Sequence, residues 1–172
     1  MKRTIEIINE LKKEKLIKDY VIGGGIATIF YTEPILTYDL DVFIIPAEKK
    51  EKKNLIVLSP VFDYLEDKGY KWKGEHIIIE GVPVQFIPAD KLEEEAVRNA
   101  KEIEYEGIKT KVMKPEYLLS LLLRAGRRKD IEKIERLLEQ TKIDMKKLKD
   151  ILHKYGLSEK FKRVLRRNDY AQ

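Results

Sequence analysis

Cysteine is absent from this sequence of 172 residues, and histidine occurs at only two positions, His76 and His153. Without cysteine the chain cannot form disulfides, cysteine-ligated zinc sites, iron–sulfur clusters or a thiol nucleophile. Two histidines leave almost no room for a histidine-based metal site, and we expect His76 to be an edge residue of the sheet rather than a ligand. Any bound metal would be a hard cation held by carboxylates, which indicates Mg²⁺ or Mn²⁺.

Long apolar runs are also missing. No segment approaches the roughly 18 apolar residues that are needed to cross a bilayer. Residues 1–18 alternate charged and aliphatic side chains, unlike a secretory signal. Hydrophobic residues still make up 43% of the chain, enough for the core of one compact domain. We therefore expect a cytoplasmic protein with no membrane partner.

The two halves of the chain differ in charge. Residues 1–90 contain 13 basic and 15 acidic side chains, whereas residues 91–172 contain 22 and 15. Clustered Lys and Arg attract phosphates, so the second half favours a polyanionic partner such as RNA. The alternative is that these side chains form the solvated faces of helices, as they do in many soluble proteins.

The spacing of apolar residues, glycines and prolines predicts an α/β (α+β) fold, a small mixed sheet flanked by helices. We expect strands over residues 20–22, 38–45, 70–80, 82–87 and 108–113. We expect helices over residues 4–18, 26–30, 60–68 (with Ser59 as its cap), 91–104, 115–125, 129–140, 144–155 and 158–167. The lysine-rich residues 48–53 indicate an exposed loop or helix start. Residues 1–113 would form the α/β core and residues 114–172 a helical C-terminal subdomain packed on it.

Two acids, Asp39 and Asp41, lie on the expected strand over residues 38–45. Residues i and i+2 of a strand project to the same face, so both carboxylates can converge on one metal ion. With 30 acids in the chain, the acid-x-acid pattern alone is weak evidence. The apolar residues around the pair make it stronger, because two like charges on a central strand repel unless a cation lies between them.

Three glycines, Gly23, Gly24 and Gly25, separate a strand from a helix. Backbone N–H groups at such a turn, together with the N-terminus of the helix, can bind phosphate oxygens. The alternative is that the glycines serve only a tight turn and close packing of the helix on the sheet. The run is neither a Walker A loop nor a dinucleotide-binding fingerprint.

Taken together, Gly24-Gly25-Ile26-Ala27, Tyr31, Glu33-Pro34, Thr37 and Asp39-Leu40-Asp41 resemble the nucleotidyltransferase superfamily. More narrowly, they resemble minimal nucleotidyltransferase domains and the nucleotidyltransferase toxins of abortive-infection (type IV) toxin–antitoxin systems. The segment Ala125-Gly126-Arg127-Arg128-Lys129-Asp130 is similar to the Arg-x-Lys-Asp segment that opens a C-terminal helix in those proteins. The resemblance spans roughly residues 20–138.

The resemblance implies a set of roles. Asp39 and Asp41 would hold Mg²⁺ or Mn²⁺, and the glycine turn at Gly24 and Gly25 would bind the phosphates of a nucleoside triphosphate (NTP). Thr37, Arg127 and Lys129 would complete the nucleotide site, although a solvated helix start explains Arg127 and Lys129 equally well.

The chain departs from the family pattern at three positions. Gln85 stands where a third, catalytic carboxylate is usual, and a glutamine cannot take a proton at neutral pH. Ile35 and Leu122 stand where the family often has Arg and Lys. Two acids on the preceding strand, Glu75 and Glu80, are candidates to replace the missing carboxylate.

Two functions follow from these residues. The first is a Mg²⁺-dependent nucleotidyltransferase that moves a nucleoside monophosphate from an NTP to RNA (tRNA-like) or protein, as a toxin with an antitoxin partner. The second is a catalytically degenerate relative that binds nucleotide or RNA without turnover. The pair Asp39 and Asp41 favours the first, and the change at Gln85 favours the second.

Overall fold

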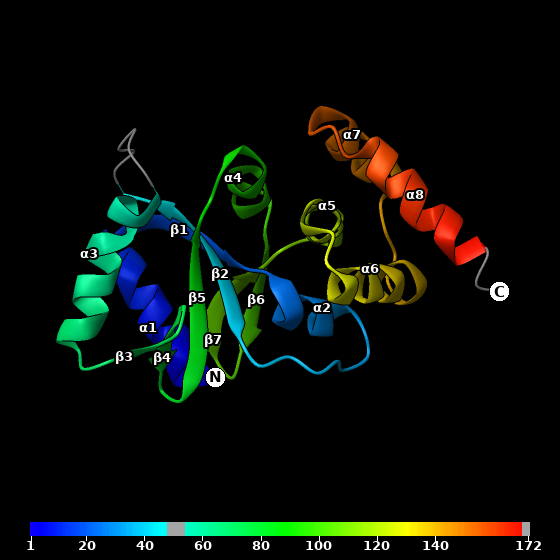
Figure 1. Ribbon diagram of the computed structural model, residues 1–172. Coiled ribbons are helices and arrows are strands. Elements are labelled where there is room, and N and C mark those ends of the chain that lie inside the picture. The colour runs from blue at the N-terminus through cyan, green and yellow to red at the C-terminus, as the bar shows by residue number, and fades with distance from the viewer. Residues whose placement is uncertain (48–53, 170–172) are drawn as a thin grey trace.

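A computed structural model describes residues 1–47 and 54–169 (Figure 1). Within these residues the chain forms a seven-stranded sheet in the order β3-β4-β5-β2-β1-β7-β6, with helices on both faces. The strands are β1 (Ile17–Ile22), β2 (Leu40–Pro46), β3 (Lys71–Lys73), β4 (His76–Ile79), β5 (Val82–Pro88), β6 (Lys101–Tyr105) and β7 (Ile108–Val112). The helices are α1 (Lys2–Lys13), α2 (Gly24–Tyr31), α3 (Asn54–Asp67), α4 (Lys91–Arg98), α5 (Pro115–Ala125), α6 (Arg128–Gln140), α7 (Met145–Lys154) and α8 (Ser158–Asp169).

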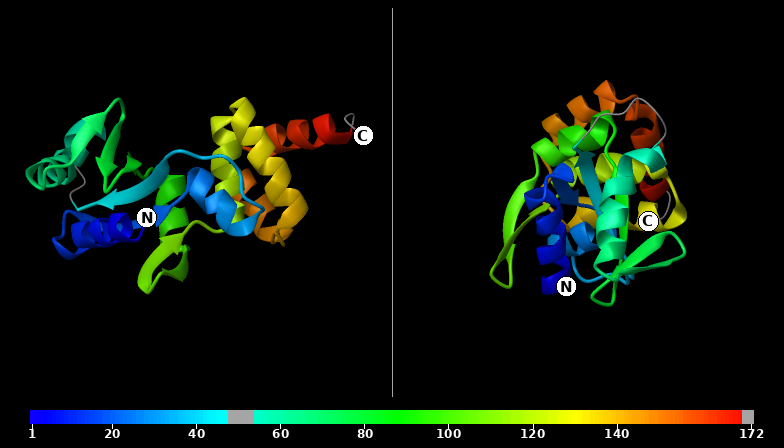
Figure 2. Two further views of the ribbon diagram at one scale, coloured as in Figure 1. Left: turned by 90° about the horizontal axis from the view of Figure 1, so that it is seen from below. Right: turned by 90° about the vertical axis from the view of Figure 1, so that its left-hand side faces the viewer.

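The sheet is mixed, as expected. Strand β2 runs parallel to β5 and antiparallel to β1, while β1 runs parallel to β7. Figure 2 shows α1 and α3 on one side of the sheet and the helices from α5 to α8 on the other. Each side has its own buried cluster. Ile8 of α1 and Leu65 of α3 belong to one, with the inward side chains of five strands.

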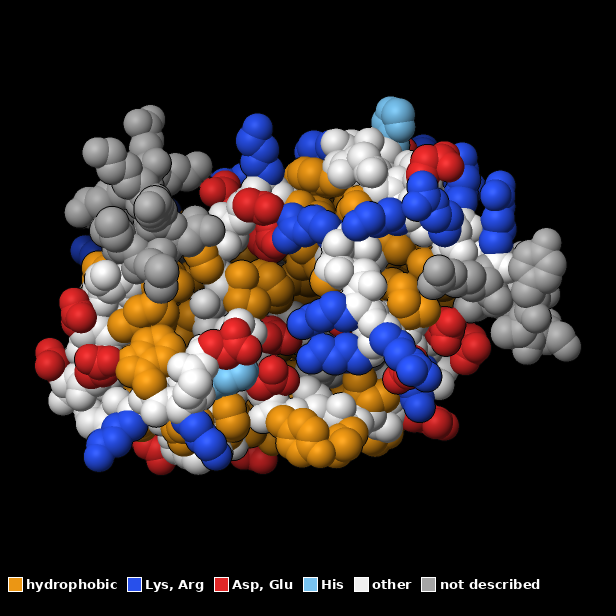
Figure 3. Space-filling view, viewed as in Figure 1, with side chains coloured by type: hydrophobic (Ala, Val, Ile, Leu, Met, Phe, Trp, Pro, Cys, Tyr) orange, Lys and Arg blue, Asp and Glu red, His pale blue; other side chains and the backbone are white. Residues whose placement is uncertain are grey.

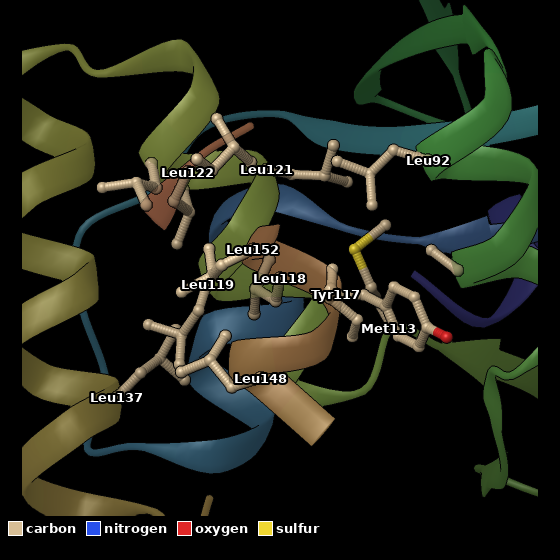
Figure 4. Packing of buried hydrophobic residues seen from close by; sticks show 14 of the residues in the cluster. Leu92, Met113, Tyr117, Leu118, Leu119, Leu121, Leu122, Leu137, Leu148 and Leu152 are labelled. Atoms are coloured by element: carbon tan, nitrogen blue, oxygen red, sulfur yellow. The ribbon is translucent and has the colours of Figure 1, made fainter. Parts of the chain in front are cut away.

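The second cluster lies where α5 crosses the other face of the sheet. Helix α5 is buried nearly all round, and its leucines contact residues of α4, α6 and α7 (Figure 4). A helix that is apolar on every side packs inside a protein. The same cluster includes Val21, Ala27 and Leu92, which precede residue 114, so the boundary between residues 113 and 114 stays a proposal.

Four sequence expectations need correction. The expected helix over residues 91–104 ends at Arg98, because residues 101–105 alternate and pair with β7 as strand β6. The expected strand over residues 70–80 is itself a hairpin, β3 and β4, which turns at Gly74 with φ +65°. Helix α3 begins at Asn54, so Ser59 does not cap it and Pro60 lies inside it. Finally, α1 ends at Lys13 and β1 already begins at Ile17. The lysine-rich residues 48–53 lie outside the described residues.

Candidate active site

The site is built where the end of β1 meets the start of β2. Ile22 pairs with Val42, and the Gly23 N–H donates to the carbonyl oxygen of Asp41 at 3.0 Å. Because β1 and β2 are antiparallel, the glycine turn after β1 and the two acids at the start of β2 come together. Helix α2 starts at Gly24 and points its N-terminus into the same region.

At two positions of the turn, neighbouring side chains lie so close to the backbone that only glycine fits. Gly24 has φ +56°, and a Cβ atom there would overlap the carboxylate of Asp41. A Cβ atom at Gly25 would overlap the hydroxyl of Thr37. The Thr37 hydroxyl in turn donates to Asp39 Oδ1 at 3.5 Å. The absence of side chains at Gly24 and Gly25 therefore lets the start of α2 lie directly against Asp41 and Thr37.

The acids share one face of the sheet with residues of the neighbouring strands. Asp41 pairs with Gln85 in the parallel β2–β5 register, so their side chains lie side by side. The expected strand over residues 38–45 begins only at Leu40, so Asp39 directly precedes β2 rather than lying on it. Its Oδ2 is 3.5 Å from Nε2 of His76 on β4. The expectation of an edge position for His76 was wrong, because β4 lies between β3 and β5.

Burial and like charge make the acid pair electrostatically unfavourable without a cation. Burial is the main cause that raises the pKa of Asp41, and the charge of Asp39 raises it further. Lys133, Arg127 and Lys129 oppose this shift. A divalent cation beside the two carboxylates would remove the cause of the repulsion.

The basic side chains come from α6, across the cavity from the acids. Arg127 caps α6 and forms a bidentate ion pair with the fully buried Asp130, at 2.7 and 3.1 Å. Lys133 Nζ lies 4.0 Å from the same carboxylate. The hydrogen bond from Arg127 to Asp130 raises the pKa of Arg127. Asp130, which the sequence analysis gave no role, thus holds the cations in place.

A cavity of about 550 Å³ joins these groups. Its walls include both acids, Gly24, Gln85, Glu75, Arg127, Lys129, Lys133, Glu93, Arg124 and an apolar strip of Phe43, Ile87, Leu118, Leu121 and Leu122. A second cavity of about 500 Å³ adjoins it, and Ile35, Thr37, Asp39, Lys129, Lys133 and Arg136 are among its lining residues. In Figure 3 acidic side chains gather near the middle of the face, with Lys and Arg side chains flanking them on the right.

Most of the site residues that the sequence indicated come together: Asp39, Asp41, Gln85, Gly24, Thr37, Arg127 and Lys129 each line at least one of the two cavities. Gly25 lines neither cavity and packs against Thr37 instead. Glu75 lines the first cavity, whereas Glu80 accepts a hydrogen bond from the Tyr70 hydroxyl at 2.8 Å in the β4–β5 turn. Of the two candidate replacement acids, which lie in turns on either side of β4 rather than on a strand, only Glu75 therefore lines this cavity.

Sequence reasoning missed several members of the site. Lys133 follows Lys129 by four residues on the same helix face, which is a signal that could have identified it. Glu93, Arg124 and His76 depend on long-range packing, and no local pattern marks them.

The donor set suits magnesium or manganese. Over residues 1–47 and 54–169, no group of three or more His, Cys, Asp or Glu side chains is arranged to hold a metal ion. Mg²⁺ is commonly bound by one or two carboxylates together with substrate phosphates. Asp39 and Asp41, which line one cavity with Gly24, fit that kind of site.

A mixed sheet with an acid pair opposite a glycine turn at a helix N-terminus defines a nucleotidyltransferase-like protein. The chain belongs to the family described as nucleotidyl transferase of unknown function (DUF2204), whose model matches residues 1–167.

Two solved structures support the fold. An antigenic nucleotidyltransferase-like protein from Paracoccidioides brasiliensis is 17% identical, with a TM-score of 0.53 over 93% of this chain and 90% of that one. The antibiotic-resistance factor ANT(2'')-Ia is 14% identical, with a TM-score of 0.50 over 98% and 96% of the two chains. At these identities the likeness shows the fold. No curated protein matches the sequence, and within the described residues no helix is long and apolar enough to cross a membrane.

Proposed function

We propose that this protein is an Mg²⁺- or Mn²⁺-dependent nucleotidyltransferase that transfers a nucleoside monophosphate from an NTP to an acceptor. One observation carries the proposal: the half-buried acids Asp39 and Asp41 line one cavity with Gly24, at the N-terminus of α2, and the Asp41 carboxylate lies directly against Gly24. A cation held by these carboxylates would neutralise the charge of the α-phosphate and of the leaving pyrophosphate.

The chain's own residues would bind and orient the nucleotide. Backbone N–H groups at Gly24 and Gly25 face the position of the phosphates. Arg127 and Lys129, with Lys133, supply positive charge from the opposite wall. Asp130 fixes the direction of the Arg127 guanidinium and so reduces the entropy lost when it binds an anion.

The acceptor's proton needs a destination. As the acceptor hydroxyl bonds to the α-phosphorus, the bond to pyrophosphate breaks and the hydroxyl proton must leave. Gln85 lies beside Asp41 but cannot accept this proton. Glu75, which lines the same cavity, is the carboxylate we propose for that step.

We further propose RNA, tRNA-like in shape, as the acceptor, with a protein hydroxyl as the alternative acceptor. Exposed basic side chains continue from the cavity along the C-terminal helices, among them Lys160, Lys162, Arg163 and Arg166. Such a surface attracts a phosphate backbone. A toxin that modifies RNA would need an inhibitory antitoxin partner and, because it draws on NTPs, a cytoplasmic location.

Gln85 favours one other function. A relative that has lost its catalytic carboxylate could still bind metal and nucleotide, or RNA, without turnover. That protein would keep nucleotide binding and lack transfer.

The test uses NTPs labelled at either the α- or the γ-phosphate, incubated with Mg²⁺, total RNA and total protein. We expect acceptor labelling from the α-label and none from the γ-label, which distinguishes nucleotidyl from phosphoryl transfer. Asp39→Asn should abolish labelling, and Asp150→Asn, which removes an exposed acid on α7, should retain it. Transfer that persists in Asp39→Asn would contradict the metal assignment. Nucleotide binding without any transfer would support the non-catalytic relative.

A further inference from the structure

Glu93 is a buried acid in the cavity wall that the proposed chemistry does not use. It lies in the first turn of α4 and is only 3% exposed. Its Oε1 pairs closely with Arg124 Nη2, and its Oε2 has no hydrogen-bond partner. A buried carboxylate oxygen without a partner costs free energy, so its persistence calls for a ligand or a water molecule that donates to it.

Arg124 holds the Glu93 carboxylate in place and is itself held by a second acid. Arg124 Nη1 donates to Asp90 Oδ2 at 2.8 Å, while Nη2 donates to Glu93. Both terminal nitrogens of Arg124 are therefore engaged by protein carboxylates. Glu93 lines the cavity, its buried Oε2 is the oxygen left without a partner, and an ionised carboxylate can only accept hydrogen bonds.

The position of Glu93 along the cavity is informative. Strand β2 carries Asp41 and then Phe43 on one face, and β5 carries Gln85 and then Ile87 in register with them. Two residues of strand advance about 7 Å. Ile87 and the turn into α4 therefore separate Glu93 from the acid pair along the chain, and the side chains of the apolar strip line the same cavity.

These features match the parts of a nucleotide in order. The acids and the glycine turn suit the phosphates, the apolar strip of Phe43, Ile87 and the α5 leucines suits a nucleobase, and Glu93 adds a hydrogen-bond acceptor to the same cavity wall. Ligand sites commonly combine apolar walls with one or two polar groups that set orientation and specificity. We propose that Glu93, positioned by Arg124, selects the nucleobase of the NTP by accepting a hydrogen bond from an exocyclic amino group.

This inference rests on the proposed function, since it requires the nucleotide to bind with its phosphates at the acid pair. It concerns which nucleobases the site binds. Adenine and cytosine present an amino group at the edge opposite the sugar. Hypoxanthine and uracil present a carbonyl oxygen there, which a carboxylate repels. ATP and CTP are thus favoured over inosine triphosphate (ITP) and UTP.

The test is equilibrium binding of CTP, UTP, ATP and ITP in the presence of Mn²⁺, measured by titration calorimetry. For the unmodified protein we expect CTP to bind at least about 10-fold more tightly than UTP, and ATP than ITP by a similar factor, because hydrogen bonds to charged groups are the stronger kind. Glu93→Gln keeps an oxygen for Arg124 and turns an amide N–H toward the base, so both preferences should shrink or reverse.

Glu94→Gln is the matched control, because it removes the same charge one residue along α4 from a side chain that pairs with Arg98 at 2.7 Å. It should leave both ratios unchanged. Equal affinities for each pair in the unmodified protein, as a permanently bound water at Oε2 would give, overturn the inference even if Glu93→Gln fails to fold. Unchanged ratios in folded Glu93→Gln overturn it too. In both cases the bound NTPs leave the nucleotidyltransferase proposal standing, whereas absence of all NTP binding would overturn both.

Discussion

Replacing Gly24 with alanine would place a methyl group where the Asp41 carboxylate lies. Two effects add. The residue has φ +56°, and a side chain in this left-handed region costs about 1–2 kcal/mol. The overlap then forces Asp41 or the start of α2 to move, and inserting a methyl into a packed site costs about 1–3 kcal/mol. We expect Gly24→Ala to lower the free energy of unfolding by about 2–5 kcal/mol.

Gly156→Ala separates the two effects. Gly156 also has a left-handed backbone, φ +68°, but no heavy atom lies within 4 Å of a Cβ built there. It should show only the backbone cost of about 1–2 kcal/mol. The difference between the two variants in urea unfolding then measures the overlap with Asp41.

Gly24→Ala and Gly156→Ala should differ more strongly in transfer activity than in stability. Displacing a metal-binding carboxylate by about 1 Å can reduce a rate about 100-fold, so Gly24→Ala should lose at least that much transfer and also bind Mn²⁺ more weakly. Gly156→Ala should retain both. If Gly24→Ala matches Gly156→Ala in stability, Mn²⁺ affinity and transfer, the close approach of the turn to Asp41 has no functional meaning and the reasoning is refuted.

Three other substitutions test separate parts of the site. Asp41→Asn should stabilise the metal-free protein at pH 7 by about 0.5–2 kcal/mol, as removing strained active-site groups often does. The sign follows from the raised pKa of Asp41: its protonated form stabilises the fold, and this contribution is complete below the ordinary value of 3.8 and lost as pH rises through the raised pKa. Urea unfolding from pH 4 to pH 8 should show the advantage of the variant growing with pH, and a constant difference would contradict it. Asp130→Asn should lower the free energy of unfolding by about 1–3 kcal/mol and should also weaken nucleotide binding. The double variant Asp130→Asn/Arg127→Ala should bind nucleotide no more weakly than Arg127→Ala alone; additive losses of affinity would show that Asp130 does not act through Arg127. Gln85→Asp, which adds a second carboxylate beside Glu75 in the cavity, should raise the transfer rate about 10-fold, because general bases contribute about 100-fold or more; an unchanged rate would show that an acid at position 85 does not take the acceptor's proton.

The elements that the sequence predicted well are those with an unambiguous local pattern. Helix α5 begins at Pro115 and ends before Gly126, which has φ +65° and can adopt the left-handed conformation that terminates a helix. The prediction of one helix over residues 91–104 was wrong because the charged and scattered apolar residues of this segment fit a helix and a strand equally well. Only the pairing of Glu102 with Lys111 and of its neighbours on β7 decides for a strand after residue 100.

The same distinction explains the site. Asp39 and Asp41 lie two residues apart and the three glycines are contiguous, so short-range geometry was enough to predict that the members of each group lie together. Their approach to each other follows from one antiparallel pairing, Ile22 with Val42. Glu93 reaches the cavity through the packing of α4 and α5, and His76 reaches Asp39 through the position of β4 in the sheet. Contacts of this kind join residues far apart in sequence, and no local spacing encodes them.

Crystals grown with Mn²⁺ and a non-hydrolysable NTP would test the central claim most directly, through the anomalous signal of manganese. The account predicts a manganese peak in contact with the carboxylates of Asp39 and Asp41 and phosphate oxygens at the N-terminus of α2. A nucleotide bound elsewhere, or the two carboxylates turned apart with no manganese between them, would contradict it.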